Sequence, residues 1–125
     1  NRIIHFFIKY HKYRLGLKLG FSIPENVAKK GLQLVHYGSI VINANTKIGE
    51  NCRIHTCTNI GTANKSSKAP VIGDNVYIGP GAKIYGEITI ASNIKIAPNA
   101  AVSKDFLMEN VIIGGVPAKQ ISKSK

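Results

Sequence analysis

An aliphatic residue recurs at every sixth position through the middle of this 125-residue chain, and this spacing constrains the fold more than any other feature. A period of six matches neither a helix nor a simple half-buried strand. It fits short strands separated by sharp turns, in which three six-residue units make one coil of about 18 residues. Ten of the eleven positions in the row are β-branched and aliphatic: Ile42, Ile48, Ile54, Ile60, Ser66, Ile72, Ile78, Ile84, Ile90, Ile96 and Val102.

The residues around this row support an all-β solenoid. A second row, two positions earlier in each unit, is mostly small or apolar, and many of the following residues are Gly, Asn or Ala. β-Branched residues suit strands, whereas Gly and Asn suit turns that need a positive φ. Stacked coils would pair their backbones and fill a thin interior with the aliphatic row, which predicts a parallel β-helix. A prism this short needs end caps and neighbouring copies.

Ser66 is the one exception in the row, and it lies in the polar stretch 62–69. We expect this stretch to leave the prism as a loop, although a degenerate coil edge has the same length. Loops raised from a rigid scaffold are common places for ligand binding.

The two ends of the chain differ from the repeat region. Residues 1–30 are basic and amphipathic, and we expect a helix that caps the open end of the solenoid; contact with an anionic membrane surface is the alternative. The repeat domain is predicted to span 31–121, with a frayed tail at 122–125. The first stretch does not resemble a secretory signal, and because the chain begins at Asn1 a preceding segment remains possible.

The charge and the cysteines limit the function classes. Seventeen Lys and Arg against six Asp and Glu give a net charge of +11, which favours anionic partners. No nucleic-acid-binding module is recognisable, so nucleic acid is not an expected partner. Cys52 and Cys57 are too few for a disulfide scaffold and do not form a CxxC motif, which favours a reducing cytoplasm, with the inner face of the membrane as an alternative. Cys52 falls in an inward row, and no metal site is expected.

Several motifs together resemble the hexapeptide-repeat acyltransferases, and among them the serine O-acetyltransferases. These motifs are His36-Tyr37-Gly38-Ser39-Ile40-Val41-Ile42, Ile78-Gly79-Pro80-Gly81-Ala82-Lys83-Ile84, Ile96-Ala97-Pro98-Asn99-Ala100-Ala101-Val102 and Gly114-Gly115-Val116-Pro117-Ala118-Lys119. The resemblance covers residues 31–121. It implies a left-handed coil, a homotrimer with active sites between neighbouring prisms, and acetyl-CoA as the donor. It also implies a histidine that takes the proton from an acceptor hydroxyl.

His36 matches the family's catalytic histidine, with Tyr37 beside it as a candidate acceptor contact. A hydroxyl becomes a good nucleophile when a base with a near-neutral pKa accepts its proton, and backbone N–H groups at a coil corner would then hold the thioester oxyanion. His36 is also in phase with the isoleucine row, so a purely structural role at the end of the core is the alternative. His55 is the rival base, and we expect it to line the site or a contact between copies.

The resemblance also implies contacts with coenzyme A at the turns of successive coils. Proline has no N–H, so contacts at the two prolines would use the carbonyl or the ring. Lysine suits the nucleotide phosphates as a point charge, and Lys104 is a weaker candidate than Lys119 for this role. The matching positions are Gly61, Thr62, Gly79, Pro80, Gly81, Ala97, Pro98 and Lys119.

The sequence departs from the serine enzymes where they hold their acceptor. Val35 and Phe21 stand where the family has aspartates, and Glu25 is the nearest acid. The loop reads Ser67-Lys68-Ala69-Pro70, so Lys68 alone is left to replace the arginine that grips a carboxylate. We therefore expect O-acetylation of a sugar of a surface polysaccharide. L-Serine O-acetylation, N-acetylation of an amino sugar, and a non-catalytic or metal-binding scaffold are the alternatives; the metal version lacks a third histidine.

Overall fold

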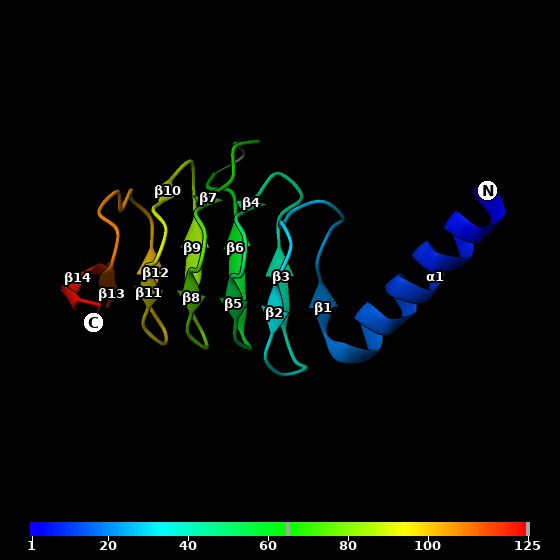
Figure 1. Ribbon diagram of the computed structural model, residues 1–125, viewed down its shortest axis with the longest axis horizontal. Coiled ribbons are helices and arrows are strands. Elements are labelled where there is room, and N and C mark those ends of the chain that lie inside the picture. Colours follow the sequence, from blue (N-terminus) through cyan, green and yellow to red (C-terminus); the bar gives the residue numbers. More distant parts are fainter. Residues whose placement is uncertain (65, 125) are drawn as a thin grey trace.

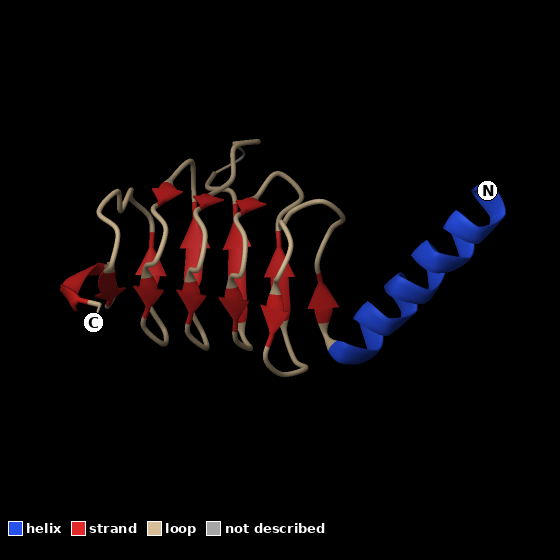
Figure 2. Ribbon diagram, in the orientation of Figure 1, coloured by secondary structure: helices blue, strands red, loops and turns tan. Residues whose placement is uncertain are grey.

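The computed structural model describes residues 1–64 and 66–124, and it shows a column of short strands with one helix projecting from its N-terminal end (Figures 1 and 2). Helix α1 spans Arg2–Leu19. The strands are β1 (Phe21–Ser22), β2 (Gln33–Leu34), β3 (Ile40–Ile42), β4 (Lys47–Ile48), β5 (Arg53–Ile54), β6 (Thr58–Gly61), β7 (Val71–Ile72), β8 (Tyr77–Ile78), β9 (Lys83–Tyr85), β10 (Thr89–Ile90), β11 (Lys95–Ile96), β12 (Ala101–Val102), β13 (Val111–Gly114) and β14 (Lys119–Lys123).

The strands form three faces of a prism, and each face is a sheet built from successive coils. Face A has the order β1-β3-β6-β9-β12, face B has β10-β7-β4, and face C has β14-β13-β11-β8-β5-β2. All strand pairs are parallel except β13–β14, which is antiparallel, and the isoleucines are in register: Ile54 lies beside Ile78, and Ile78 beside Ile96. The predicted parallel β-helix is therefore confirmed.

The core is the stack of aliphatic side chains inside the prism. Ile54, Ile78, Ile84 and Ile96 are completely buried, and the neighbouring row contributes small side chains such as Ala82. The alternation follows from the strand period of two, which turns every second side chain inward. Burial of this apolar area is the main term that stabilises a column made of short strands.

Asparagines with left-handed backbone conformation turn the chain from face B to face C. Asn51, Asn75 and Asn93 have φ values of 55°, 54° and 59°. Asparagine tolerates this region better than other side chains with a Cβ. The Asn75 Nδ2 donates a hydrogen bond to the Asn93 Oδ1 at 3.1 Å, so the turn residues also join one coil to the next.

The stretch after β6 leaves the prism as a loop, as predicted. Ile48 pairs with Ile72, 24 residues further on, whereas Ile72 pairs with Ile90 after the regular 18. The six additional residues form the projection between β6 and β7 at the top of Figure 1. Asn45 Nδ2 donates to the Ser67 carbonyl at 2.7 Å, and Lys68 pairs with Glu87 at 2.5 Å, so coils on both sides hold the loop. Residue 65 lies outside the described residues.

Both predicted boundaries of the repeat domain need correction. The first coil begins at Phe21, not at residue 31, because Phe21 pairs with Ile40 and Val27 is already buried in the core. The predicted frayed tail is also wrong for its described part. Ser122 pairs with Ile112 in the antiparallel strand β14, and the Ser124 N–H donates to the Asn110 carbonyl, so backbone hydrogen bonds hold this segment. Residue 125 lies outside the described residues.

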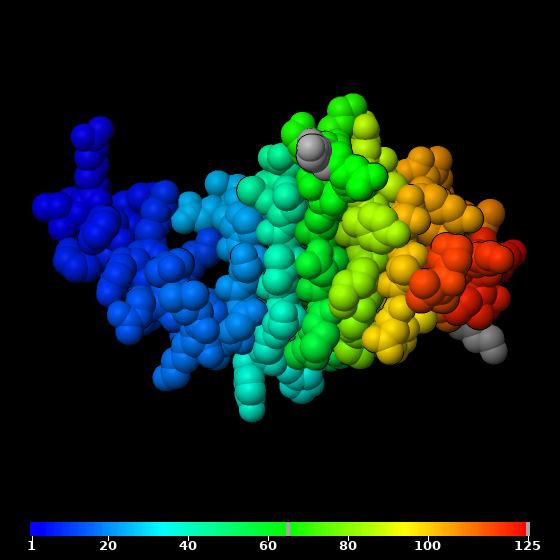
Figure 3. All heavy atoms as spheres, turned by 180° about the vertical axis from the view of Figure 1, so that it is seen from behind, coloured from blue at the N-terminus to red at the C-terminus, as the bar shows by residue number. Residues whose placement is uncertain are grey.

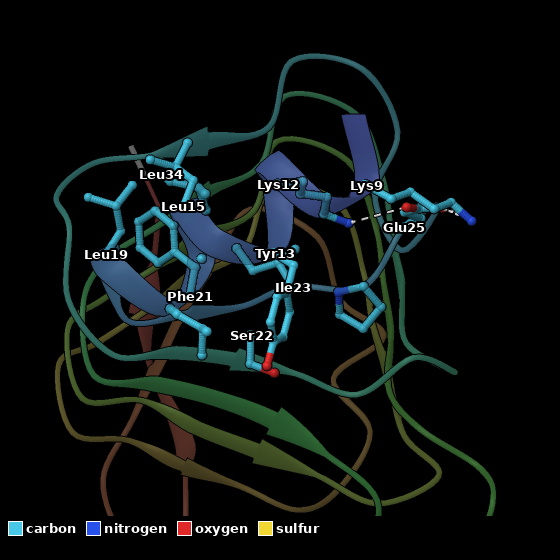
Figure 4. Close-up of a pocket in the computed structure, with 13 residues that line it drawn as sticks. Lys9, Lys12, Tyr13, Leu15, Leu19, Phe21, Ser22, Ile23, Glu25 and Leu34 are labelled. Atoms are coloured by element: carbon cyan, nitrogen blue, oxygen red, sulfur yellow. Dashed lines mark ion pairs between the residues drawn. The ribbon is translucent and has the colours of Figure 1, made fainter. Parts of the chain in front are cut away.

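The expected N-terminal helix is present, but none of its residues is buried. Its last turn joins the first coil, where the Gly38 N–H donates to the Leu19 carbonyl at 2.8 Å. The helix then runs obliquely away from the column, so it covers the open end only in part (Figure 1). A hollow of about 680 Å³ separates its C-terminal half from the first coil (Figure 4). None of the described helical segments has the length and apolarity that a bilayer crossing requires.

Candidate functional site

The turns that follow the strands of face C stack into one continuous edge of the column, which we call the corner row. It consists of residues 35–37, 55–57, 79–81, 97–99 and 114–115, placed by the register of Leu34, Ile54, Ile78, Ile96 and Ile113. It contains the lower turns of Figure 1. Both candidate histidines and five of the eight predicted coenzyme A contacts therefore lie along one edge.

His36 and His55 are neighbours at the N-terminal end of the corner row. Their ring centroids are 6.3 Å apart, and the Tyr77 ring lies 5.1 Å from that of His55 on the other side. His36 itself is exposed. The alternative that His36 ends the core is wrong, because the coil from Leu34 to Ile54 has 20 residues and Leu34 takes the inward position.

His55 occupies a more enclosed position than His36. Its Nε2 atom is buried without a hydrogen-bond partner among the described residues. Burial, together with the nearby Arg53 and His36, lowers the pKa of His55 below its usual value. His55 is therefore a neutral imidazole near pH 7, beside an exposed one.

The middle of the corner row is built from residues with little or no side chain. A Cβ atom on Gly79 would lie 2.8 Å from the Ile96 carbonyl oxygen, and Gly81 has a φ of 78°. Glycine is therefore needed at both positions for different reasons: close approach of the next coil at Gly79, and a left-handed conformation at Gly81. The result is a narrow, smooth edge beyond the two histidines.

The predicted oxyanion donors are not available at these glycines. The N–H groups of Gly79, Gly81 and Ala97 donate to the carbonyls of Ile96, Thr56 and Ile113, at 2.9, 2.9 and 2.8 Å. These bonds join adjacent coils, and proline supplies no N–H. Ligand contacts in this part of the row must therefore use carbonyls, ring surfaces or side chains.

Lys119 lies at the opposite end of the same edge. It pairs with Gly114 at the start of β14, the last strand of face C. With about 4.8 Å between neighbouring strands, β2 and β14 are separated by roughly 24 Å. The row thus carries imidazoles at one end and a lysine at the other.

Three predicted site residues, Gly61, Thr62 and Lys68, lie away from the corner row. Gly61 ends β6 and Thr62 follows it at the edge between faces A and B, and Lys68 lies in the loop beyond them, on a different edge from the corner row. Tyr37 is adjacent to His36 and 79% exposed. The alternative acid, Glu25, pairs with Lys9 and Lys12 of α1 (Figure 4).

Sequence reasoning missed two residues that contact the corner row. The Tyr77 ring lies beside that of His55 at a tilt of 58°, and the register of β5 with β8 is the signal that places it there. Lys83 sends its Nζ to the carbonyls of Cys57 and Gly81, at 2.5 and 2.9 Å, and so stabilises two successive turns. Within the described parts of the chain, no three His, Cys, Asp or Glu side chains are arranged to hold a metal ion.

Comparisons with known proteins agree with this architecture. The family described as bacterial transferase hexapeptide (six repeats) matches residues 69–104. A serine acetyltransferase of Helicobacter pylori is 32% identical over 98 residues, covering 77% of this chain and 57% of that protein. A serine acetyltransferase of Buchnera aphidicola is 33% identical, covering 99% of this chain and 52% of that protein.

Solved structures give the same result. Serine acetyltransferase from Brucella abortus in complex with coenzyme A has a TM-score of 0.73 at 34% identity, covering 79% of this chain and 41% of that one. A serine O-acetyltransferase from Brucella melitensis has a TM-score of 0.82 at 29% identity, covering 95% and 48%. The chain spans about half the length of the curated relatives it matches.

The chain therefore carries the repeat of the bacterial hexapeptide transferases at residues 69–104, and its column is a left-handed parallel β-helix. It is similar to the serine acetyltransferases.

Proposed function

We propose that this protein is an acetyl-CoA-dependent O-acetyltransferase in which His36 is the general base. The exposed imidazole of His36 at the head of the corner row carries the proposal. His36 would take the proton of an acceptor hydroxyl, and the oxygen would attack the thioester carbon, releasing the thiol of coenzyme A. A general base of this kind contributes about 10²- to 10⁴-fold to the rate.

Acetyl-CoA would lie along the corner row, with its thioester at His36 and its phosphates near Lys119. The edge at Gly79, Pro80, Gly81, Ala97 and Pro98 has no large side chain that would block an extended pantetheine arm. Pantetheine would contact ring surfaces and carbonyls there, because three of the N–H groups are occupied. One relative has been crystallised with coenzyme A, which supports this choice of donor.

His55 would line the site as a neutral neighbour of His36. Its lowered pKa and its buried Nε2 make it a poor base for the hydroxyl of a solvent-exposed substrate. Because the ring of His55 is uncharged, it places no positive charge beside His36 when His36 takes up a proton. We therefore assign the base role to His36.

We propose L-serine as the acceptor, in place of the sugar expected from the sequence. These relatives and solved neighbours are named serine acetyltransferases, and their names mention no glycan acceptor. Lys68 supplies one cation for the carboxylate of the amino acid, although it now pairs with the exposed Glu87. Exchange of this surface ion pair for a serine carboxylate has a small cost, because exposed pairs contribute little.

The positions of His36 and Lys68 support a site shared between copies. In one chain they lie on different edges of the prism, because His36 follows β2 of face C and Lys68 lies between β6 of face A and β7 of face B, so a single column does not bring them together. In a homotrimer of parallel columns, the loop at 62–70 of one copy would face the corner row of the next. Gly61 and Thr62 would then contact coenzyme A from the neighbouring copy.

With two free cysteines and acetyl-CoA as donor, we place the enzyme in the cytoplasm.

Release of free thiol from acetyl-CoA tests the proposal, with L-serine, an amino sugar and a panel of glycans offered separately to the purified protein. We expect turnover with L-serine. His36→Asn should lower kcat by about 10²- to 10⁴-fold and leave the KM for acetyl-CoA nearly unchanged. His11→Asn is the matched control, because His11 lies on exposed helix α1. Turnover with a glycan alone would reject serine, and full activity of His36→Asn would reject the base assignment.

A further inference from the structure

Helix α1 exposes a large apolar and aromatic surface. None of its residues is buried, and Phe6, Phe7, Ile8 and Leu17 are each more than 60% exposed. Phe6 stacks on Tyr10 with 6.4 Å between ring centroids, so the aromatic rings form a contiguous group. Isolated apolar residues are normal on a surface, but a continuous group of this size indicates a binding surface.

The same helix carries a uniform positive charge. It contains Arg2, Lys9, Lys12, Arg14 and Lys18 and has no Asp or Glu. Lys9 and Lys12 point toward the first coil and meet Glu25, at 3.5 and 4.0 Å (Figure 4). Arg14 instead donates to the Tyr10 hydroxyl and lies over its ring, and among the described residues neither Arg14 nor Lys18 forms an ion pair.

Two aromatic residues and then two cations follow one another along one row of this helix. Phe6, Tyr10, Arg14 and Lys18 follow one another at intervals of four, so they share a side of the helix. Lys and Arg can bury their stems in an apolar layer while the charged ends reach the anionic headgroups above it. Aromatic rings with a polar tip, such as that of Tyr10, favour the same interface.

A second copy of the chain is a poorer match for this surface than an anionic layer. Two such helices would bring ten cations together without one acid of their own, whereas negatively charged lipids complement every outward cation. The helix also stands clear of the column (Figure 3), so it can lie against a flat surface without the prism colliding with it.

We infer that α1 binds the surface of an anionic lipid bilayer through Phe6, Phe7, Tyr10, Arg14 and Lys18, and holds the column next to the membrane. The helix lies on the bilayer and does not span it, because cations recur along its whole length. This inference is independent of the acceptor and of the catalytic role of His36.

Vesicle flotation tests this inference on the whole chain. Vesicles of phosphatidylcholine alone are compared with vesicles that also contain phosphatidylglycerol. We expect binding to the anionic vesicles only, and weaker binding at high salt, because the attraction between charges is screened. The double variant Arg14→Gln/Lys18→Gln should bind the anionic vesicles about 30-fold more weakly. Phe6→Ser/Phe7→Ser should also reduce binding, because the apolar anchor is lost.

Lys47→Gln/Lys95→Gln is the matched control, since it removes two exposed cations from the column and should change binding less than about threefold. None of these α1 side chains is buried, so circular dichroism should show the same β-structure in all variants. Equal loss in the control variant would overturn the inference, because net charge alone would then explain binding. Failure to bind anionic vesicles, with self-association that depends on Phe6 and Phe7, would assign the surface to a second copy.

Discussion

The imidazoles of His36 and His55 lie 6.3 Å apart, although the two residues belong to successive coils. The turn after β2 presents His36 to solvent, and the turn after β5 holds His55 between His36 and Tyr77. Two chemically identical side chains therefore differ in their surroundings. One is open to solvent, and the other has a lowered pKa.

The lowered pKa of His55 predicts how stability depends on pH. The unfolded chain protonates this imidazole near pH 6.5, whereas burial and the positive charges of Arg53 and His36 make the folded chain resist protonation. The contribution of His55 to the free energy of unfolding should thus be complete above pH 6.5 and decrease as pH falls through the lowered pKa. Urea unfolding between about pH 8 and about pH 5 measures this loss.

His55→Asn should reduce this loss of stability at acidic pH, because the group that resists protonation is gone. His11→Asn is the control for removal of an exposed histidine and should leave the pH profile unchanged. An equal acid dependence in the wild-type protein and His55→Asn would contradict the assignment.

A shared active site predicts complementation between inactive variants. His36→Asn lacks the base, and Lys68→Ala lacks the cation in the loop at 62–70. If His36 of one copy works with Lys68 of another, trimers that contain both variants have some intact sites. Activity should therefore return when the two proteins are unfolded, mixed and refolded together, and the thiol release assay measures it. Mixtures that stay as inactive as the separate variants would place both residues in one column.

Gly79 and Gly61 should respond differently to substitution by alanine, because their surroundings differ. Gly79→Ala places a Cβ atom 2.8 Å from the Ile96 carbonyl oxygen and 2.8 Å from the Pro98 nitrogen. The adjacent coil must then shift, which should cost about 1–3 kcal/mol of stability and disturb the corner row. Gly61→Ala is the matched control, because its nearest neighbour would be the Asn59 Oδ1 at 3.5 Å. Thermal unfolding of the two variants measures the difference, and equal midpoints would contradict this account of the corner.

The two cysteines should differ in reactivity toward a thiol reagent. Cys52 is completely buried, and burial raises the pKa of its thiol, whereas Cys57 is exposed on the corner row. Since the thiolate is the reactive form, Cys57 should be labelled rapidly in the native protein and Cys52 only after unfolding. Cys57→Ser should abolish the rapid phase. Rapid labelling of that variant would show that Cys52 is accessible.

The periodic part of the fold was predictable because one physical rule determines it. Strand alternation and coil spacing place Ile54, Ile78 and Ile96 on the same inward line, so counting by six identifies the core. The same counting fails for the first coil, which is two residues longer, and it therefore placed His36 in the core row instead of Leu34.

The partners of exposed side chains were not predictable in the same way. Lys68 matched the position of a carboxylate-binding cation, but in the folded chain it meets Glu87 from a later coil. Glu25 is the acid nearest in sequence to the position of the missing aspartate, but it pairs with two lysines of α1. These contacts depend on how the loop and the helix leave the column, and the repeat does not encode either direction.

The reversed direction of β14 has a consequence for how these columns can assemble. Stacked parallel strands form a template that could extend indefinitely, as in a fibril, because each coil offers its open backbone groups to the next. Here β13, the last parallel strand of face C, is covered by β14, which runs opposite to it and uses its backbone groups. A terminator of five residues thus favours discrete particles over end-to-end polymers.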